Sequence, residues 1–254
     1  MQLIDSHCHL DFPEFDNDRD ELIETCKQQG VAKFIVPGVS CVTWQRLHEI
    51  TSQYSECYAA FGLHPYFIEE HQSSDIKELE KVVKNHQPIA IGEIGLDYYV
   101  RDLNKQKQQE IFHKQLALAY EFNLPVILHV RKAHDDVLRA LRKYKVKGGV
   151  AHAFNGSQQQ AEQYLNLGFK LGFGGALTYD NAVHLRKLAQ TLPLEALVLE
   201  TDSPDMRPAD YVSSRNTPLT ILPVLDVLIR LRSESKNQIV EQASVNVEKV
   251  FGPL

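Results

Sequence analysis

The chain has 254 residues, of which 43% are hydrophobic and 24% are charged, and its formal net charge is −6 at pH 7. This length and apolar content suit one large globular domain that builds its core without disulfide bonds. The acidic balance lacks the overall positive charge of a nucleic-acid binder, although it leaves room for a local basic patch. No apolar run is long enough to span a bilayer, so we expect no membrane association.

The cysteines and the N-terminus indicate a compartment. Cys8, Cys26, Cys41 and Cys57 lie in the first quarter of the chain without CxxC spacing, which is typical of reduced thiols in the cytosol. The N-terminus runs directly into a strand that carries candidate metal ligands, and it lacks the basic and apolar regions of a signal peptide. We therefore expect a cytoplasmic protein.

Apolar strands alternate with amphipathic helices along the whole chain. The first strand begins at Leu3 and runs toward His9, and a helix over 18–29 follows it. The further strands are predicted at 33–36, 57–61, 89–93, 125–129, 148–152, 169–173 and 197–202. The further helices are predicted at 44–54, 74–85, 103–122, 133–143, 158–167, 181–190, 218–231 and 237–250.

This alternation predicts a (β/α)₈ TIM barrel, because the chain length is close to the roughly 250 residues typical of that fold. We expect a single domain over residues 1–254, with 237–250 as an extra C-terminal helix. The alternative is a doubly wound open sheet. It would not bring together the polar residues that end the first, fourth, fifth, sixth and eighth strands, whereas a closed barrel places all C-terminal strand ends around one mouth.

Five predicted strands end in histidine, glutamate or aspartate. His7 and His9 end the first strand, and strand alternation places both on one face and Cys8 on the other. Two imidazoles on one face can bind one divalent ion. The other strand ends carry Glu93, His129, His152 and Asp202. Singly, each is explained as a buried, hydrogen-bonded polar residue, but together around one barrel mouth they predict a metal site.

Four histidines and two carboxylates exceed the needs of one tetrahedral ion. We therefore predict two divalent ions, with Glu93 as the bridge because its two oxygens can bind one metal each. The predicted ligands of one ion are His7, His9, Glu93 and Asp202. Those of the other are Glu93, His129 and His152. Histidine-rich ligation favours zinc, whereas phosphoryl chemistry often uses magnesium or manganese, so the metal stays open.

Paired ions activate a bridging water and clamp the attacking and leaving oxygens, which indicates hydrolysis. Asp202 touches both metal and solvent, so we predict that it is the general base that accepts the proton of the attacking water. Strand parity places Glu200 one layer below Asp202, inside the barrel. Because an unpartnered buried carboxylate is costly, Glu200 either orients a metal-bound imidazole or pairs with a lysine or arginine.

The same segments resemble the TatD family of metal-dependent hydrolases over essentially the whole chain. The resemblance implies a binuclear site on a TIM barrel, within the wider amidohydrolase group, in which Glu93 takes the place of a modified lysine bridge. It also implies the metal-dependent 3′ exonuclease activity on DNA that is described for characterised relatives. The matching motifs, in family order, are His7-Cys8-His9, Gly62-Leu63-His64-Pro65, Gly92-Glu93-Ile94-Gly95-Leu96-Asp97-Tyr98, His129, His152-Ala153-Phe154-Asn155-Gly156 and Glu200-Thr201-Asp202-Ser203-Pro204.

The chain departs from this family after the eighth predicted strand. The family usually has a basic stretch that ends Arg-Asn-Glu-Pro, whereas this chain reads Ser213-Ser214-Arg215-Asn216-Thr217-Pro218. The missing basic residues and glutamate leave the substrate open. We predict that His64, Arg131 and Arg215 contact substrate. The alternatives are a loop hydrogen bond for His64 and simple solvent exposure for the arginines.

Three functions are compatible with these residues. The leading hypothesis is a phosphodiesterase of the 3′ exonuclease type that acts on DNA or short nucleotides. The second is hydrolysis of a small ester, amide or lactone, because the same two-metal site serves both. The third is a metal-binding scaffold without turnover, against which the intact Glu93 and Asp202 argue. We expect nucleic acid or a small phosphodiester as the partner, and a monomer without an obligate protein partner.

Overall fold

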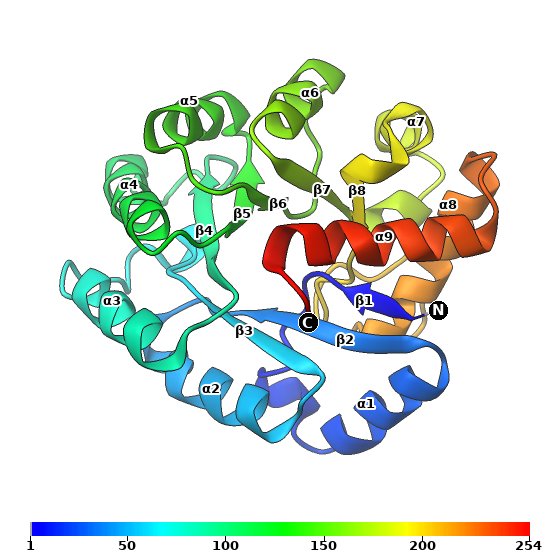
Figure 1. Ribbon diagram of the computed structural model, residues 1–254, viewed down its shortest axis with the longest axis horizontal. Helices are drawn as coiled ribbons and strands as arrows, with labels where there is room; N and C mark the ends of the chain where they lie inside the picture. Colours follow the sequence, from blue (N-terminus) through cyan, green and yellow to red (C-terminus); the bar gives the residue numbers. More distant parts are fainter. Residues whose placement is uncertain (1) are drawn as a thin grey trace.

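The computed structural model describes residues 2–254 and shows a ring of parallel strands surrounded by helices (Figure 1). Each strand pairs with its successor along the chain, from the first to the eighth. This confirms the predicted TIM barrel, and the open-sheet alternative is wrong because the strand order never reverses. The strands are β1 (Leu3–Asp5), β2 (Val31–Pro37), β3 (Cys57–Phe61), β4 (Ala90–Asp97), β5 (Val126–Arg131), β6 (Gly149–Ala151), β7 (Phe169–Phe173) and β8 (Leu197–Leu199).

The helices follow the predicted ranges closely, and side chains cap the N-termini of α4, α6 and α9. Ser157 and Ser235 each form a capping box with the glutamine three residues later, which fixes the first turns of α6 and α9. No helix among residues 2–254 is long and apolar enough to cross a membrane. The helices are α1 (Arg19–Gln28), α2 (Trp44–Gln53), α3 (Asp75–His86), α4 (Lys105–Glu121), α5 (His134–Tyr144), α6 (Gln158–Asn166), α7 (Val183–Thr191), α8 (Ile221–Leu231) and α9 (Lys236–Phe251).

The barrel interior is a small apolar layer that α9 covers at the N-terminal end of the strands (Figure 1). Val247 and Val250 of α9 pack against this layer. Asn246 fixes the helix there, because its Nδ2 donates to the carbonyls of Leu194 and Leu197 at 2.8 and 2.7 Å. The opposite end of the barrel is left for polar side chains. The strand residues of the layer are Ile4, Ile35, Ala60, Ala90, Ile127, Val150 and Val198.

A buried carboxylate joins the first strand to the segment after the last one. Asp5 is fully buried, and it accepts hydrogen bonds from the Thr201 amide at 3.0 Å and the Thr201 hydroxyl at 2.6 Å. The amide of Asp202 donates to the His7 carbonyl at 2.8 Å. These bonds close the barrel between β1 and β8, and they hold two candidate ligands side by side.

The protonation of Asp5 predicts that the stability of the protein depends on pH. Burial raises its pKa from 3.8 to about 8, against the hydrogen bonds from Thr201 and His7 that lower it. Between these two pKa values, the folded protein keeps a proton on Asp5 that the unfolded chain has lost. The free energy of unfolding therefore falls as the pH rises from about 4 to about 8. Asp5→Asn keeps the shape without the charge. In denaturant titrations of metal-free protein, we expect wild type to lose stability relative to Asp5→Asn over this pH range. Parallel pH dependences of the two proteins would contradict this.

Candidate metal centre

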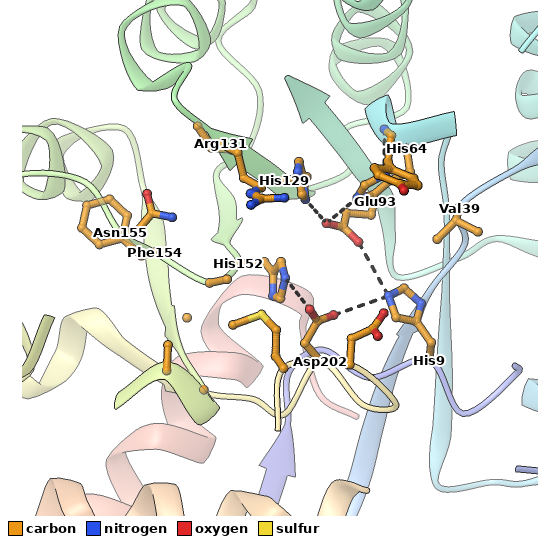
Figure 2. A pocket seen from close by; sticks show the side chains of 18 of the residues that line it. His9, Val39, His64, Glu93, His129, Arg131, His152, Phe154, Asn155 and Asp202 are labelled. Carbon is orange, nitrogen blue, oxygen red and sulfur yellow. Dashed lines mark hydrogen bonds and ion pairs between the residues drawn. The ribbon is translucent and has the colours of Figure 1, made fainter. Parts of the chain in front are cut away.

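The predicted site residues gather around a cavity of about 620 Å³ at the C-terminal mouth of the barrel (Figure 2). Much of the remaining wall is apolar, with rings contributed by Phe12, Phe67, Phe154 and Phe173. The polar floor is thus bordered by apolar side chains. The predicted residues that line the cavity are His9, His64, Glu93, His129, Arg131, His152 and Asp202, and the fully buried His7 lies behind them.

Glu93 lies between two sets of imidazoles. Its Oε2 is 3.1 Å from His7 Nε2 and 3.8 Å from His9 Nε2. Its Oε1 is 3.1 Å from His129 Nδ1 and 3.2 Å from His64 Nε2. The side chain is only 2% exposed, and no lysine or arginine among residues 2–254 pairs with it. Oε2 of Glu93 therefore faces His7 and His9, whereas Oε1 faces His129 and His64.

Asp202 faces Glu93 across the floor of the cavity. Its Oδ1 lies 3.4 Å from His7 Nε2 and 3.6 Å from His9 Nε2, and its Oδ2 lies 3.5 Å from His152 Nε2. Its side chain is 16% exposed against 2% for Glu93, so it is the more accessible of the two carboxylates. Asp202 also has a positive φ of 54°, a backbone conformation that non-glycine residues adopt mainly at turns and functional sites.

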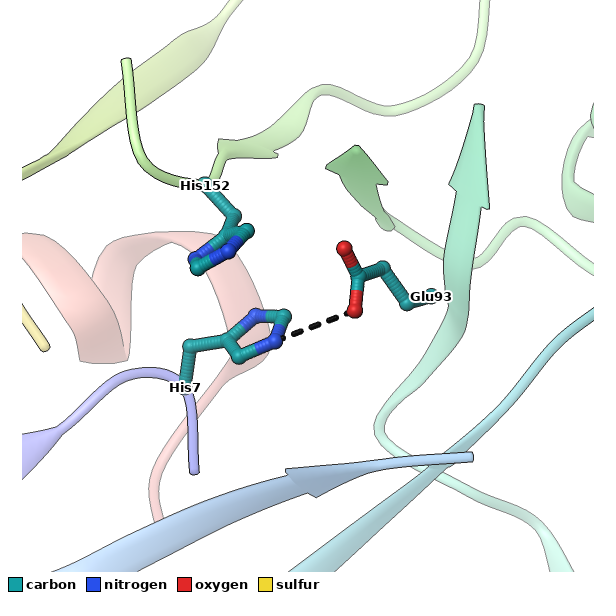
Figure 3. Close-up of side chains that lie close together, drawn as sticks. All are labelled: His7, Glu93 and His152. Atoms are coloured by element: carbon teal, nitrogen blue, oxygen red, sulfur yellow. Dashed lines mark ion pairs between the residues drawn. The ribbon is translucent and has the colours of Figure 1, made fainter. Parts of the chain in front are cut away.

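Three overlapping groups of side chains have the spacing to hold a cation. Within each group, one ligand atom per residue lies within 4.8 Å of the others. One group agrees with the predicted ligands of the first ion, but none combines His129 with His152. His152 stacks instead on His7, with ring centroids 3.6 Å apart and Glu93 beside the two rings (Figure 3). The groups are His7, His9 and Asp202; His7, Glu93 and His152; and His64, Glu93 and His129.

The donor set fits a divalent cation. It consists of imidazole nitrogens and carboxylate oxygens, which are the ligands that zinc and related metals take in hydrolases. His7 Nδ1 is buried without a hydrogen-bond partner, and Nε2 of the same ring faces both carboxylates. Such a concentration of buried ionisable groups is costly unless an ion organises it.

Glu200 lies beneath this layer, as strand parity predicts. Its Oε1 is 2.9 Å from His152 Nδ1 and accepts a hydrogen bond from the Ala153 amide at 2.7 Å. The absence of a side chain at Gly172 makes room for it, because a Cβ there would lie 2.1 Å from Glu200 Oε2. The alternative ion pair with a lysine or arginine is not found among residues 2–254. Orientation of the His152 ring by Glu200 remains our prediction for its role.

Asp97 has the corresponding position beside His129, and sequence reasoning assigned it no role. Its buried carboxylate places Oδ2 3.0 Å from His129 Nε2 and 3.6 Å from Arg131 Nη1. Its Oδ1 accepts from the amide of Tyr99 at 2.9 Å. The signal was present in the sequence, since residues 93, 95 and 97 share one strand face. Asp97 therefore links a candidate ligand to the cavity rim.

The ionisation of the carboxylates follows from these contacts. Burial alone raises the pKa of Glu93, but its contacts with His64, His7 and His129 outweigh burial and hold the pKa well below its ordinary value. Burial likewise opposes ionisation of Asp202, yet His152 keeps its pKa low. Burial lowers the pKa of His9, and its contact with Asp202 raises that pKa to about 9. Metal binding would therefore displace protons from imidazoles that already face ionised carboxylates.

The two predicted substrate arginines differ in position. Arg131 lines the cavity, with its guanidinium 4.3 Å above the Tyr99 ring, and its side chain is 43% exposed. Arg215 lies away from the cavity wall, where it pairs with Asp18 and stacks 4.6 Å above Phe15. A substrate contact by Arg215 stays a prediction, and it would require this side chain to leave Asp18. Among residues 2–254, Arg131 is the one lysine or arginine in the cavity lining.

A metal-dependent hydrolase on a TIM barrel is the class that this fold and donor set define. The family model described as "TatD related DNase" matches residues 4–252. The chain therefore belongs to the TatD family of metal-dependent hydrolases.

Similar proteins agree with this assignment. The chain is 38% identical to the "Uncharacterized metal-dependent hydrolase YjjV" of Escherichia coli K12, over 98% of each chain. It is 32% identical to the "3'-5' ssDNA/RNA exonuclease TatD" of Klebsiella pneumoniae, again over 98% of each chain. The crystal structure of Escherichia coli YjjV, a TatD homologue, superimposes with a TM-score of 0.96 at 37% identity and covers 99% of this chain and 98% of its own. The fold and the family are thus shown together.

The contact between Asp97 and His129 predicts an effect on metal affinity. Asp97→Asn keeps the size of the side chain and removes the charge that makes it a strong acceptor. Loss of such an orienting partner weakens metal binding by roughly 10–100-fold. We expect this loss in zinc titrations followed by calorimetry. Asp136→Asn, on the nearby but separate Tyr98 hydroxyl contact, is the matched control, and equal affinities in the two variants would contradict the role of Asp97.

Proposed function

We propose that this protein is a phosphodiesterase of the 3′ exonuclease type that uses two divalent ions and has Asp202 as its general base. The observation that carries the proposal is the position of Glu93, with one oxygen toward His7 and the other toward His129. Two ions bound at these positions would supply Lewis-acid stabilisation of a phosphoryl group and a water of lowered pKa.

The protein's own residues have separate tasks in this proposal. Asp202 is ionised and reaches the cavity, so it orients the attacking water and accepts its proton. Arg131 holds one anionic oxygen of the substrate at the rim. The apolar rings around the floor exclude other water, which strengthens each electrostatic contact.

The exonuclease part of the proposal is supported by relatives. Those from Klebsiella pneumoniae and Pantoea ananatis are named "3'-5' ssDNA/RNA exonuclease TatD" and cover nearly the whole chain.

One observation supports a second candidate function, which is hydrolysis of a small ester, amide or lactone. The cavity is largely apolar and has one arginine, so a small neutral or singly charged substrate fits it as well.

The first prediction concerns metal content. We expect two divalent ions per chain in protein saturated with zinc, manganese or magnesium. Because Glu93 faces both sides of the site, Glu93→Ala should weaken both ions, whereas His129→Ala should weaken one preferentially. Elemental analysis after dialysis against excess metal checks this. A single ion at saturation would refute the binuclear assignment.

The second prediction concerns proton transfer. Asp202→Asn keeps size and hydrogen bonding but removes the charge that accepts the proton, so turnover should fall by roughly 10²–10⁴-fold. The measurement is kcat on a short single-stranded oligonucleotide, and on simple phosphodiesters, esters and lactones. Metal content is measured on the same samples. Near-normal turnover with metal retained would show that another group activates the water.

The third prediction concerns the substrate. Each cationic contact to a polynucleotide steepens the fall of affinity with salt, by a slope of about 0.7 per phosphate for single strands. Arg131 is the one such contact in the cavity lining among residues 2–254. We therefore expect action at strand ends or on short oligonucleotides with a shallow salt dependence. A steep slope with a strong preference for long strands would overturn this, and turnover of a lactone or amide alone would favour the second function.

A further inference from the structure

The ring of His64 is fixed by the short helix that follows it. His64 is the N-cap of the 3₁₀ helix η3 (Pro65–Phe67), and its Nδ1 accepts a hydrogen bond from the Tyr66 amide at 3.0 Å. Its carbonyl oxygen accepts from His71 Nε2 at 2.9 Å. Both the side chain and the backbone of this residue are therefore held in one position.

This hydrogen bond decides which nitrogen carries the proton. A backbone amide can only donate, so Nδ1 must be an unprotonated acceptor. This hydrogen bond excludes the Nδ1–H tautomer and the doubly protonated ring, because in either form the Nδ1–H donor would face the Tyr66 N–H donor. The proton of His64 is therefore on Nε2. This nitrogen lies in the cavity wall, 3.2 Å from Glu93 Oε1 (Figure 2).

Three of the four candidate ligand histidines show the opposite arrangement, whereas His7 Nδ1 has no hydrogen-bond partner. Metal-binding histidines generally donate a hydrogen bond from the nitrogen that does not bind the metal, which leaves a lone pair on the other. Three rings of this site have an acceptor oxygen beside the far nitrogen, at 3.1, 2.9 and 3.0 Å. His64 has a donor there instead. The three rings and their acceptors are His9 with the Pro37 carbonyl, His152 with Glu200, and His129 with Asp97.

We propose that His64, although it lies within ligand distance of Glu93 and His129, is a fixed N–H donor rather than a metal ligand, and that its Nε2–H binds an anionic oxygen of the substrate. Coordination through Nε2 would move the proton to Nδ1 and break the cap on η3. As a donor, His64 keeps this cap, and its Nε2–H, which lies 3.2 Å from Glu93 Oε1, would be shared between that carboxylate and the substrate oxygen. The identity of the oxygen, a phosphoryl oxygen, rests on the proposed function, whereas the exclusion of metal does not.

The tautomer can be tested directly by nuclear magnetic resonance. Protein labelled with ¹⁵N-histidine is recorded in long-range ¹H–¹⁵N spectra, without metal and after saturation with zinc, and His64 is assigned from the His64→Asn spectrum. We expect a protonated Nε2 and an acceptor Nδ1 in both states. Addition of inorganic phosphate to the zinc form should then shift the Nε2 resonances of His64. A zinc-bound Nε2 with the proton on Nδ1, or no response to phosphate, would overturn the proposal.

A pair of variants separates the proposal from the general function. In His64→Asn the amide oxygen occupies the place of Nδ1, so the cap is kept while the donor is lost. It should bind as many zinc ions as wild type, and its kcat should fall about 10²-fold, as for loss of one oxyanion donor. His129→Asn is the control that should lose zinc. Loss of a zinc ion from His64→Asn would refute the donor role. If wild type hydrolyses no phosphodiester, the proposed function fails, while the spectra and zinc content still decide the metal exclusion.

Discussion

The burial of one carboxylate constrains the rest of the site. Glu93 is 2% exposed, and its charge is offset only by imidazoles from β5 and from the segments after β1 and β3, with no lysine or arginine partner among residues 2–254. A buried ion without a strong partner is costly, so these rings must be near it in the native fold. The barrel meets this requirement because its parallel strands end at one mouth. Asp202 and Asp97 contact the same rings from the other side, and Glu200 contacts His152.

The barrel and the convergence of its strand ends could be predicted from the sequence, because both depend on local patterns. Alternation along the strands and along the segments that follow them gives the facing of Glu93, His7 and Glu200, and the repeated strand–helix unit gives the ring. Side-chain rotation does not follow from such patterns. His152 stacks on His7 and has Nδ1 beside Glu200, and these contacts join segments that are far apart in the sequence. Arg215 illustrates the same limit, since its partner Asp18 lies 197 positions earlier in the chain.

The segment after β8 keeps one framework residue of the family motif. Asn216, which the chain keeps, is fully buried and donates to the carbonyls of Thr201 and Asp205 at 2.9 and 2.7 Å. Its Oδ1 accepts from the Thr220 hydroxyl at 2.6 Å. These bonds hold the segment against the base of the site whatever surrounds them. The departures from the family therefore lie outside the cavity lining and leave the frame of Asp202 intact.

The candidate metal site can form only when folding has closed the barrel. Asp5 and Thr201 are 196 positions apart, and the candidate ligands come from both ends of this span. The unfolded chain thus has no preformed site, and contacts of such long range form slowly during folding. A metal ion that recognises only the native chain shifts the folding equilibrium by mass action, by about 2.7 kcal/mol at a concentration one hundred times its dissociation constant. The supply of metal in the cell would then set how much of the chain survives folded, as well as how much of it is active.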